Sequence, residues 1–179
     1  MIIKISKNDY ITSIWEGGTT SQVTIFPKTA EVAKQDFIYR ISTATVDIDS
    51  TFTKYNKYIR YLVSLDNTIL LNETKKLKPL EIYNFLGSDL TTSKGKCTDF
   101  NLICDEKYAC NMEVLILKSK KHVCNYNHYY LYCYKNSDIL IDNVMYKISS
   151  NDSLAIYKDT FDLEIISGNA ILCSVAVKQ

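Results

Sequence analysis

Residues 37–48 read FIYRISTATVDI, and this stretch decides the fold. Its β-branched and aromatic residues are typical of a half-buried β-strand, in which side chains alternate between two faces. Arg40 and Ser42 lie on one face, in a row that is otherwise aliphatic. In a small β-barrel such a row faces the interior. We therefore expect an arginine inside a barrel. The rest of the row is Ile38, Ala44, Val46 and Ile48.

The rest of the chain has the same β character. Short runs rich in Ile, Val, Tyr and Thr alternate with turn residues, and only Thr29–Gln35 has a short helical pattern. Many short strands favour an antiparallel sandwich or barrel, so we expect an all-β protein with almost no helix. The expected strands are Gln22–Phe26, Phe37–Ile48, Tyr58–Leu65, Thr68–Leu71, Leu80–Phe85, Phe100–Cys104, Met112–Leu117, Tyr129–Tyr134, Asp138–Ile141, Leu154–Tyr157, Phe161–Ile166 and Ala170–Val177.

A faint internal repeat suggests two lobes. Residues 61–72 and 130–142 share the order strand, turn around Asn, aliphatic strand, and each copy is followed by a further strand ending in Tyr. A repeat spaced by about 70 residues suits two similar β-barrel lobes, although unrelated β-hairpins can resemble each other by chance. We predict a first lobe over residues 1–105, which carries the polar motifs. A second, structural lobe follows over residues 106–179, packed with the first as one compact unit.

Composition excludes several partners. Lys+Arg total 21 and Asp+Glu 20, so the formal net charge of +1 gives no electrostatic case for nucleic acid or an anionic membrane. No apolar run approaches the ~20 residues that span a bilayer. Lysines interrupt the N-terminus where a signal peptide needs an apolar core, so we expect a cytoplasmic protein. Exposed strand edges are compatible with a homodimer, but no sequence feature requires one.

Metal chemistry has little support in the sequence. The 6 cysteines show no CxxC spacing, and we expect free, mostly buried thiols. His122, Cys124 and His128 lie close together, but their HxCx3H spacing matches no strong zinc pattern. We expect no metal and no cofactor.

Two arginines and two neighbouring polar residues form the candidate constellation. Arg60 shares a face with Tyr58, Leu62 and Ser64, which places it either at a polar barrel mouth or outside in solvent. Asp99 and Asn101 share a face of a later strand, so Asp99 can be the internal partner of either arginine. A buried arginine needs an anionic or acceptor-rich partner. The planar guanidinium suits a carboxylate, either of the protein or of a ligand.

Six motifs in order resemble the HutD/Ves family of cupin-like proteins. They include W-x-G-G-T-T-x-Q, F-x-x-R-I-S-x-A-x-V and S-x-G-K-x-T-D-F-N-L. The chain departs from the family pattern at residues 55–59, where the family often has proline and glycine, and at residues 103–105, where it often has methionine and arginines. The motifs fall at Trp15–Gln22, Phe37–Val46, Ser50–Thr53, Arg60–Leu65, Phe85–Asp89 and Ser93–Leu102.

The resemblance implies a double-lobed, jelly-roll cupin (bicupin) fold without the usual cupin metal ligands. For HutD it implies regulation of histidine utilisation by sensing a pathway intermediate, such as a formylated glutamate or urocanate. For Ves it implies a link to environmental stress. It places the ligand pocket in the motif-bearing half. Carried over residue by residue, the expected ligand-binding positions are Trp15, Thr20, Gln22, Arg40, Ser42, Arg60, Asp99 and Asn101.

Three functions follow from these residues. The first is a non-enzymatic protein that binds or senses a small carboxylate in the first barrel. The second is a metal-independent isomerase or hydrolase with Asp99 or Glu16 as base. One argument counts against it: we expect a neighbouring arginine to lower the pKa of the carboxyl, which makes the carboxylate a weaker base. The third is a structural module in which Arg40 and Asp99 neutralise each other. We rank them in this order.

Overall fold

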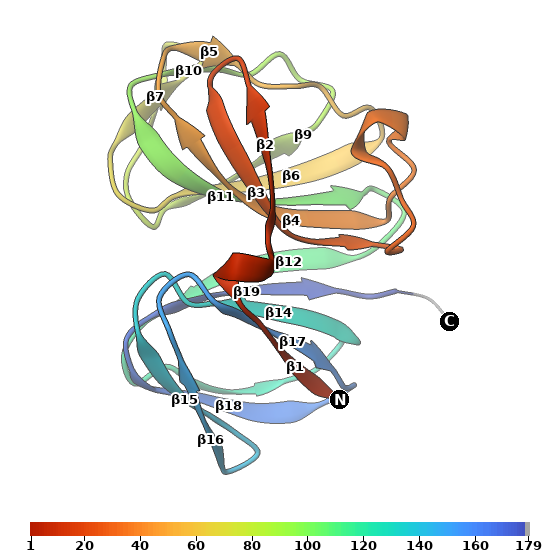
Figure 1. Cartoon of the computed structure of the whole chain (residues 1–179), viewed down its shortest axis with the longest axis vertical. Helices are drawn as coiled ribbons and strands as arrows, with labels where there is room; N and C mark the ends of the chain where they lie inside the picture. The colour runs from red at the N-terminus through yellow and green to blue at the C-terminus, as the bar shows by residue number, and fades with distance from the viewer. Residues whose placement is uncertain (178–179) are drawn as a thin grey trace. The chain divides into compact units, whose positions relative to one another are not determined.

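The computed structural model describes residues 1–177, and its strands pair almost entirely in antiparallel ladders (Figure 1). The expected all-β fold with almost no helix is confirmed. In the described part of the chain, no helix is long and apolar enough to cross a membrane. The chain divides into two compact units, the larger formed by Tyr10–Lys107 and the smaller by Met1–Asp9 together with Tyr108–Gln179.

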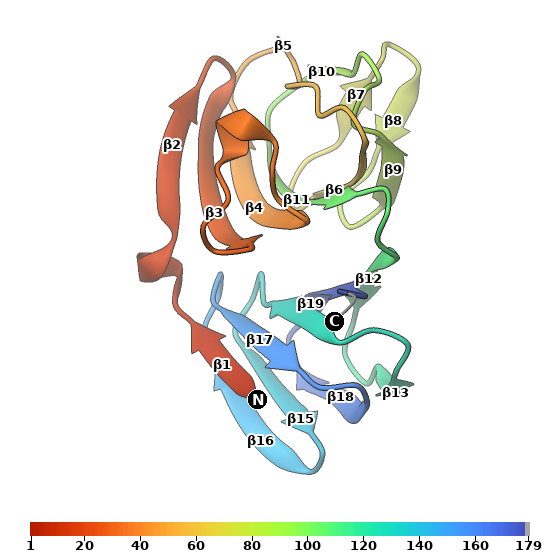
Figure 2. The ribbon, with the colours of Figure 1, turned by 90° about the vertical axis from the view of Figure 1, so that its right-hand side faces the viewer.

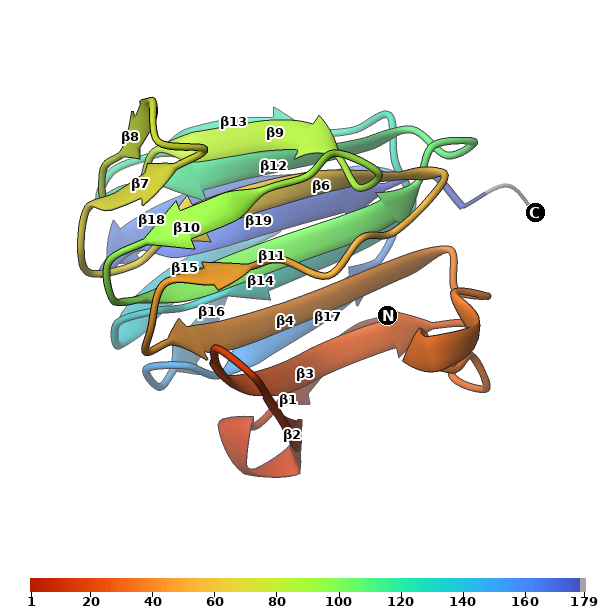
Figure 3. The ribbon, with the colours of Figure 1, turned by 90° about the horizontal axis from the view of Figure 1, so that it is seen from above.

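The larger unit contains two antiparallel sheets. A six-stranded sheet has the order β2-β3-β4-β11-β6-β9, and a four-stranded sheet has the order β5-β10-β7-β8 (Figure 3). The elements are β2 (Ile11–Trp15), β3 (Gly18–Phe26), the 3₁₀ helix η2 (Val32–Lys34), β4 (Tyr39–Val46), β5 (Ser50–Thr51), β6 (Tyr58–Ser64), β7 (Ile69–Leu71), β8 (Lys75–Leu77), β9 (Ile82–Leu86), β10 (Thr92–Lys94) and β11 (Cys97–Asp105).

The smaller unit is built in the same way. A five-stranded sheet has the order β1-β17-β14-β19-β12, and a four-stranded sheet has the order β13-β18-β15-β16 (Figure 2). The elements are β1 (Ile2–Ile5), the 3₁₀ helix η1 (Lys7–Asp9), β12 (Cys110–Leu115), β13 (Lys120–Val123), β14 (His128–Tyr132), β15 (Ser137–Ile141), β16 (Val144–Ile148), β17 (Ser153–Tyr157), β18 (Phe161–Ser167) and β19 (Ala170–Val175).

The order of elements expected from the repeat is present in both units. In the larger unit β6 pairs with β9 while the intervening β7 pairs with β8. In the smaller unit β14 pairs with β17 while β15 pairs with β16. A strand in one sheet, a hairpin in the other sheet and a return to the first sheet therefore occur twice in the chain, as a duplication would produce.

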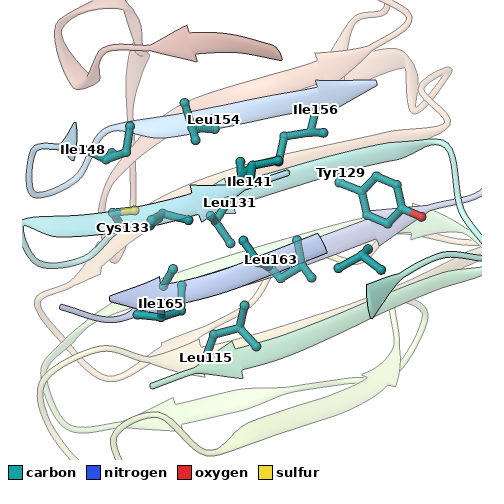
Figure 4. Packing of buried hydrophobic residues seen from close by; sticks show 14 of the residues in the cluster. Leu115, Tyr129, Leu131, Cys133, Ile141, Ile148, Leu154, Ile156, Leu163 and Ile165 are labelled. Carbon is teal, nitrogen blue, oxygen red and sulfur yellow. The ribbon is translucent and has the colours of Figure 1, made fainter. Parts of the chain in front are cut away.

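Buried apolar side chains fill the interior of the smaller unit (Figure 4). Alternate residues of β14, β15 and β18 face this core, including Leu131, Ile141 and Leu163, each at most 1% exposed. Tyr129 closes one part of the core with an edge-to-face contact to Phe161 at a ring-centroid distance of 5.0 Å. Aliphatic and aromatic side chains thus occupy this unit's core.

The first nine residues depart from the expected lobe boundaries. The boundary expected after residue 105 lies close to the observed one after Lys107, but Met1–Asp9 belongs to the smaller unit rather than to a lobe of residues 1–105. The reason is that β1 pairs antiparallel with β17, and Lys4 forms an ion pair of 3.3 Å with Asp152. A pairing with so distant a segment leaves no signal in the local sequence.

Short strands and the helical pattern also differ from expectation. Of Thr29–Gln35, only the single turn η2 is helical. The strands β1, β2, β5, β8, β10, β13 and β16 were not expected. Most of these are short or carry exposed polar residues, so their partner strands, rather than an apolar alternation, hold them in place.

Candidate functional site

Polar side chains from three adjacent strands meet inside the larger unit. Arg40 on β4 and Arg60 on β6 both pair with Ile103 of β11, one from each side. One step along the same face, Asn101 pairs with Ser42, and Asp99 lies a further step beyond. Because residues two apart share a face of a strand, this register gathers both arginines, the amide and the carboxyl on one surface.

This surface lines a cavity of about 170 Å³. Seven of the eight sequence-predicted site residues line it, and Gln22 contacts one of the seven, Arg40. Tyr55 and Ile103 come from the two segments that depart from the family pattern. The lining residues are Ser13, Trp15, Thr20, Val32, Arg40, Ser42, Ala44, Phe52, Thr53, Tyr55, Arg60, Asp99, Asn101 and Ile103.

Arg40 faces the cavity as expected from the alternation of Phe37–Ile48. It is 8% exposed, and its Nε donates a hydrogen bond of 2.9 Å to Oε1 of Gln22. Burial lowers the pKa of Arg40, while the neighbouring Tyr55 opposes that shift through charge and hydrogen bonding. No ion pair joins Arg40 to an acidic residue in residues 1–177. Its terminal nitrogens therefore carry a positive charge in the cavity without a protein carboxylate against them.

Arg60 lies inside the unit rather than in solvent, which decides between the two placements that the sequence allowed. It is 6% exposed, and its terminal nitrogens donate to the Thr53 carbonyl oxygen at 3.1 Å and to Oδ1 of Asn101 at 3.0 Å. Burial lowers its pKa, and its Nε is buried without a hydrogen-bond partner. Its guanidinium carbon lies 5.3 Å from the ring centroid of Phe52, 5.7 Å from that of Tyr55 and 5.1 Å from that of Phe85.

Cation–π contacts from three rings stabilise a buried guanidinium without neutralising it. The sequence motifs contained Phe52 and Phe85, and Tyr55 lies beside them, but none was chosen as a site residue. The available signal was the close spacing of aromatic residues around the second arginine. The contacts of Arg60 fix its guanidinium in the wall of the cavity. Arg40 makes fewer such contacts, so more of its guanidinium N–H donors are available to a ligand.

Asp99 is linked to Arg60 through Asn101 rather than by a direct ion pair. The amide Nδ2 of Asn101 donates to Oδ1 of Asp99 at 2.6 Å, while its Oδ1 accepts from Arg60. Asp99 is 2% exposed, and burial raises its pKa to about 7, although the Arg60 charge and the hydrogen bond from Asn101 act in the opposite direction. A nearby arginine does act to lower this pKa, as expected from the sequence, but the expected net lowering is wrong because the desolvation of the carboxylate outweighs the attraction.

The β2–β3 hairpin supplies Trp15 and Thr20 to the cavity. Trp15 is half-buried, and its indole Nε1 is buried without a hydrogen-bond partner. Gly18 permits the tight approach of this hairpin to β4, because an added Cβ would lie 2.2 Å from the Thr45 carbonyl oxygen. Glu16 lies exposed in the turn and is not among the residues that line the cavity.

No group of three or more His, Cys, Asp or Glu residues that could hold a metal ion occurs among residues 1–177. His122 on β13 instead pairs with Asp162 at 2.8 Å, and His128 on β14 packs edge-to-face on Tyr157. None of the 6 cysteines, all of which the structure describes, forms a disulfide, and four are buried and two half-buried. The cavity lining carries two guanidinium groups and the carboxyl of Asp99, together with amide, hydroxyl and indole groups that can donate hydrogen bonds to an anion.

The fold and the cavity define a cupin-like β-protein. The model of the HutD family matches residues 7–173, and the chain belongs to this family. A search of the curated proteins finds no match.

Solved structures share the fold at low identity. A conserved protein of unknown function from Pseudomonas aeruginosa aligns with a TM-score of 0.84 at 17% identity, covering 100% of both chains. HutD from Pseudomonas fluorescens, solved in a formate condition, aligns with a TM-score of 0.84 at 19% identity, covering 100% of both chains. A bacterial pirin from Escherichia coli in complex with nickel(II) gives 0.69 at 12% identity, covering 100% of both chains.

The raised pKa of Asp99 predicts how stability depends on pH. In the unfolded chain an aspartate ionises near pH 4, whereas in the folded chain burial raises the pKa of Asp99 to about 7. The folded state therefore holds the extra proton between these values, and the contribution of Asp99 to stability falls as pH rises through this window. We expect Asp99→Asn to become progressively more stable than the parent protein from about pH 5 to about pH 8.

Urea unfolding midpoints at several pH values measure this difference. The matched control is Asp89→Asn, which alters an exposed carboxyl of the same unit that neither lines the cavity nor acts on Asp99, and it should show no such trend. A stability difference between Asp99→Asn and the parent that stays constant with pH would show that the buried carboxyl does not titrate in this range.

Proposed function

We propose that the larger unit binds a small carboxylate and that the protein acts as a non-enzymatic binding or sensing protein. The observation that carries this proposal is the Arg40 guanidinium, which lines a cavity of about 170 Å³ and is paired with no carboxylate of residues 1–177. A buried cation without an anion is unfavourable, and a carboxylate that accepts two parallel hydrogen bonds relieves this cost.

The other groups of the cavity support the same ligand class. Gln22 holds the Nε of Arg40 and so fixes the orientation of the guanidinium plane. Ser42 and Thr20 place hydroxyl groups in the lining, and the Trp15 indole adds a buried N–H that lacks a partner. A fixed arginine with hydroxyl and indole donors in the same lining is an arrangement suited to one small organic anion.

The cellular role is the second part of the proposal. Membership of the HutD family favours a regulatory role in amino-acid utilisation, with histidine utilisation or a stress response as the settings that the family resemblance suggests. Candidate ligands are formylated glutamate, urocanate and small dicarboxylates. Formate is the simplest probe of the arginine itself, because it is a carboxylate with no further group.

We expect Arg40→Ala to abolish ligand-induced thermal stabilisation while the fold survives. A ligand at 100 times its dissociation constant stabilises the folded state by about 2.7 kcal/mol, which a melting curve detects easily. Arg40→Lys should retain part of the effect, because it keeps the charge but loses the planar fork.

The melting temperature of each variant is measured with and without each candidate at millimolar concentration. Lys34→Ala is the matched control, since it removes an exposed cation of η2 that does not line the cavity. If no carboxylate of the panel shifts the melting temperature of the parent protein, the binding proposal fails.

One observation favours the alternative, a metal-independent isomerase or hydrolase. A carboxyl with a pKa of about 7 is well matched to general base catalysis near neutral pH, and Asp99 lines the cavity. Glu16, the other candidate base, is exposed and outside the lining. If the protein is an enzyme, it will convert one of the candidate ligands, and Asp99→Asn will reduce the rate by about 100-fold or more while binding remains. Absence of turnover with every ligand that binds would remove this alternative.

A further inference from the structure

Asp99 is the one acidic residue that lines the cavity in the described chain. It is 2% exposed, and no ion pair joins it to an arginine in residues 1–177. Arg60, the cation whose charge acts on it, donates instead to Asn101 and to the Thr53 carbonyl. The carboxyl is thus held in a desolvated position by hydrogen bonds and by a positive field, without a partner that fixes its charge.

The groups that face Asp99 come from several elements. Arg60 of β6 favours the carboxylate, whereas Asp66, in the turn after β6, disfavours it. Cys97, on the same strand β11 as Asp99, remains a neutral thiol, because burial raises its pKa to about 12. From β4, the backbone of Ala44 bonds to the carboxyl, and Arg40 extends into the same cavity. The charge of Asp99 is therefore favoured mainly by Arg60, and Asp99 shares its cavity with the Arg40 guanidinium.

A carboxylate bound at Arg40 changes this balance. The incoming anion neutralises the Arg40 guanidinium and places a second negative charge in the cavity that Asp99 lines. Two carboxylates that share a small site do not both remain ionised, and the buried one of the pair takes a proton. The raised pKa of Asp99 means that this proton is gained near neutral pH.

We propose that the pocket takes up one proton with each carboxylate that it binds, and that Asp99 is the group that accepts it. This inference rests on the proposed binding function. The proton comes from the solvent and forms the O–H bond of a neutral carboxylic acid on Asp99. The charge of the site is unchanged, because one anion and one proton enter together. The neutral acid also gains a donor that the ligand or a neighbouring acceptor can use.

The consequence is a receptor whose affinity depends on pH. Below about pH 7 Asp99 is already protonated in the free protein, and the affinity is independent of pH. Above that value the free protein must gain a proton to bind, and the apparent dissociation constant rises about tenfold for each pH unit. A carboxylate with an ordinary pKa stays anionic over this range, so the dependence reports the protein and not the ligand.

Formate titrations followed by tryptophan fluorescence test this inference. Trp15 is the only tryptophan of the chain and lines the cavity, so it reports binding directly. In the parent protein we expect formate to bind about tenfold more weakly at about pH 8.5 than at about pH 7.5. Asp99→Asn should bind formate with the same affinity at both values, and the control Asp89→Asn, at an exposed carboxyl outside the cavity, should keep the tenfold change.

A second measurement needs no variant. When formate at matched pH is added to weakly buffered parent protein near pH 8, a pH electrode should record the uptake of close to one proton per bound formate. Binding without proton uptake, or a pH dependence that survives Asp99→Asn, overturns the inference and leaves the binding function intact. If formate binds at no pH, the proposal that the cavity binds this carboxylate is wrong, and the proposal of coupled proton uptake is wrong as well.

Discussion

The site depends on a charged guanidinium placed inside a β-sheet unit without an acidic partner in direct contact. Such a group is costly unless its donors meet acceptors and its charge is balanced nearby. Arg60 meets this requirement with a carbonyl, an amide and three aromatic rings. Arg40 meets it only in part, through Gln22 and Tyr55. The difference between the two arginines separates a structural role from a ligand-binding role.

The two units compare a polar cavity with an apolar core on the same arrangement of strands. Within its sheet β19 has the place that β11 has in the larger unit, next to the strand that begins the repeat. The interior of β19 presents Ala170 and Leu172 to an apolar core, whereas β11 presents Asp99 and Asn101 to a cavity. The same topology thus tolerates a filled core and a polar cavity. Function on such a fold lies in the side chains of one face.

The sequence predicted the part of the site that depends on strand alternation. Arg40 and Ser42 were placed inside because their row in Phe37–Ile48 is otherwise aliphatic, and the structure confirms this placement. Arg60 could not be placed, because the opposite face of its strand, with Ile59, Tyr61 and Val63, is the more apolar in sequence, although the structure buries the face that carries Arg60. The pKa of Asp99 also could not be predicted, since it depends on burial, and burial depends on the packing of distant segments. The pairing of β1 with β17 also could not be predicted, because it joins two segments that lie far apart in the sequence.

The central claim is that the guanidinium of Arg40 receives an organic anion in the cavity of the larger unit. A crystal structure of the protein grown with a saturating carboxylate tests it most directly. The account predicts a carboxylate with both oxygens within about 3 Å of the Arg40 nitrogens, and with Arg60 still bonded to Asn101. A structure under those conditions in which Arg40 turns to a protein carboxylate, while the cavity holds only water, would contradict it.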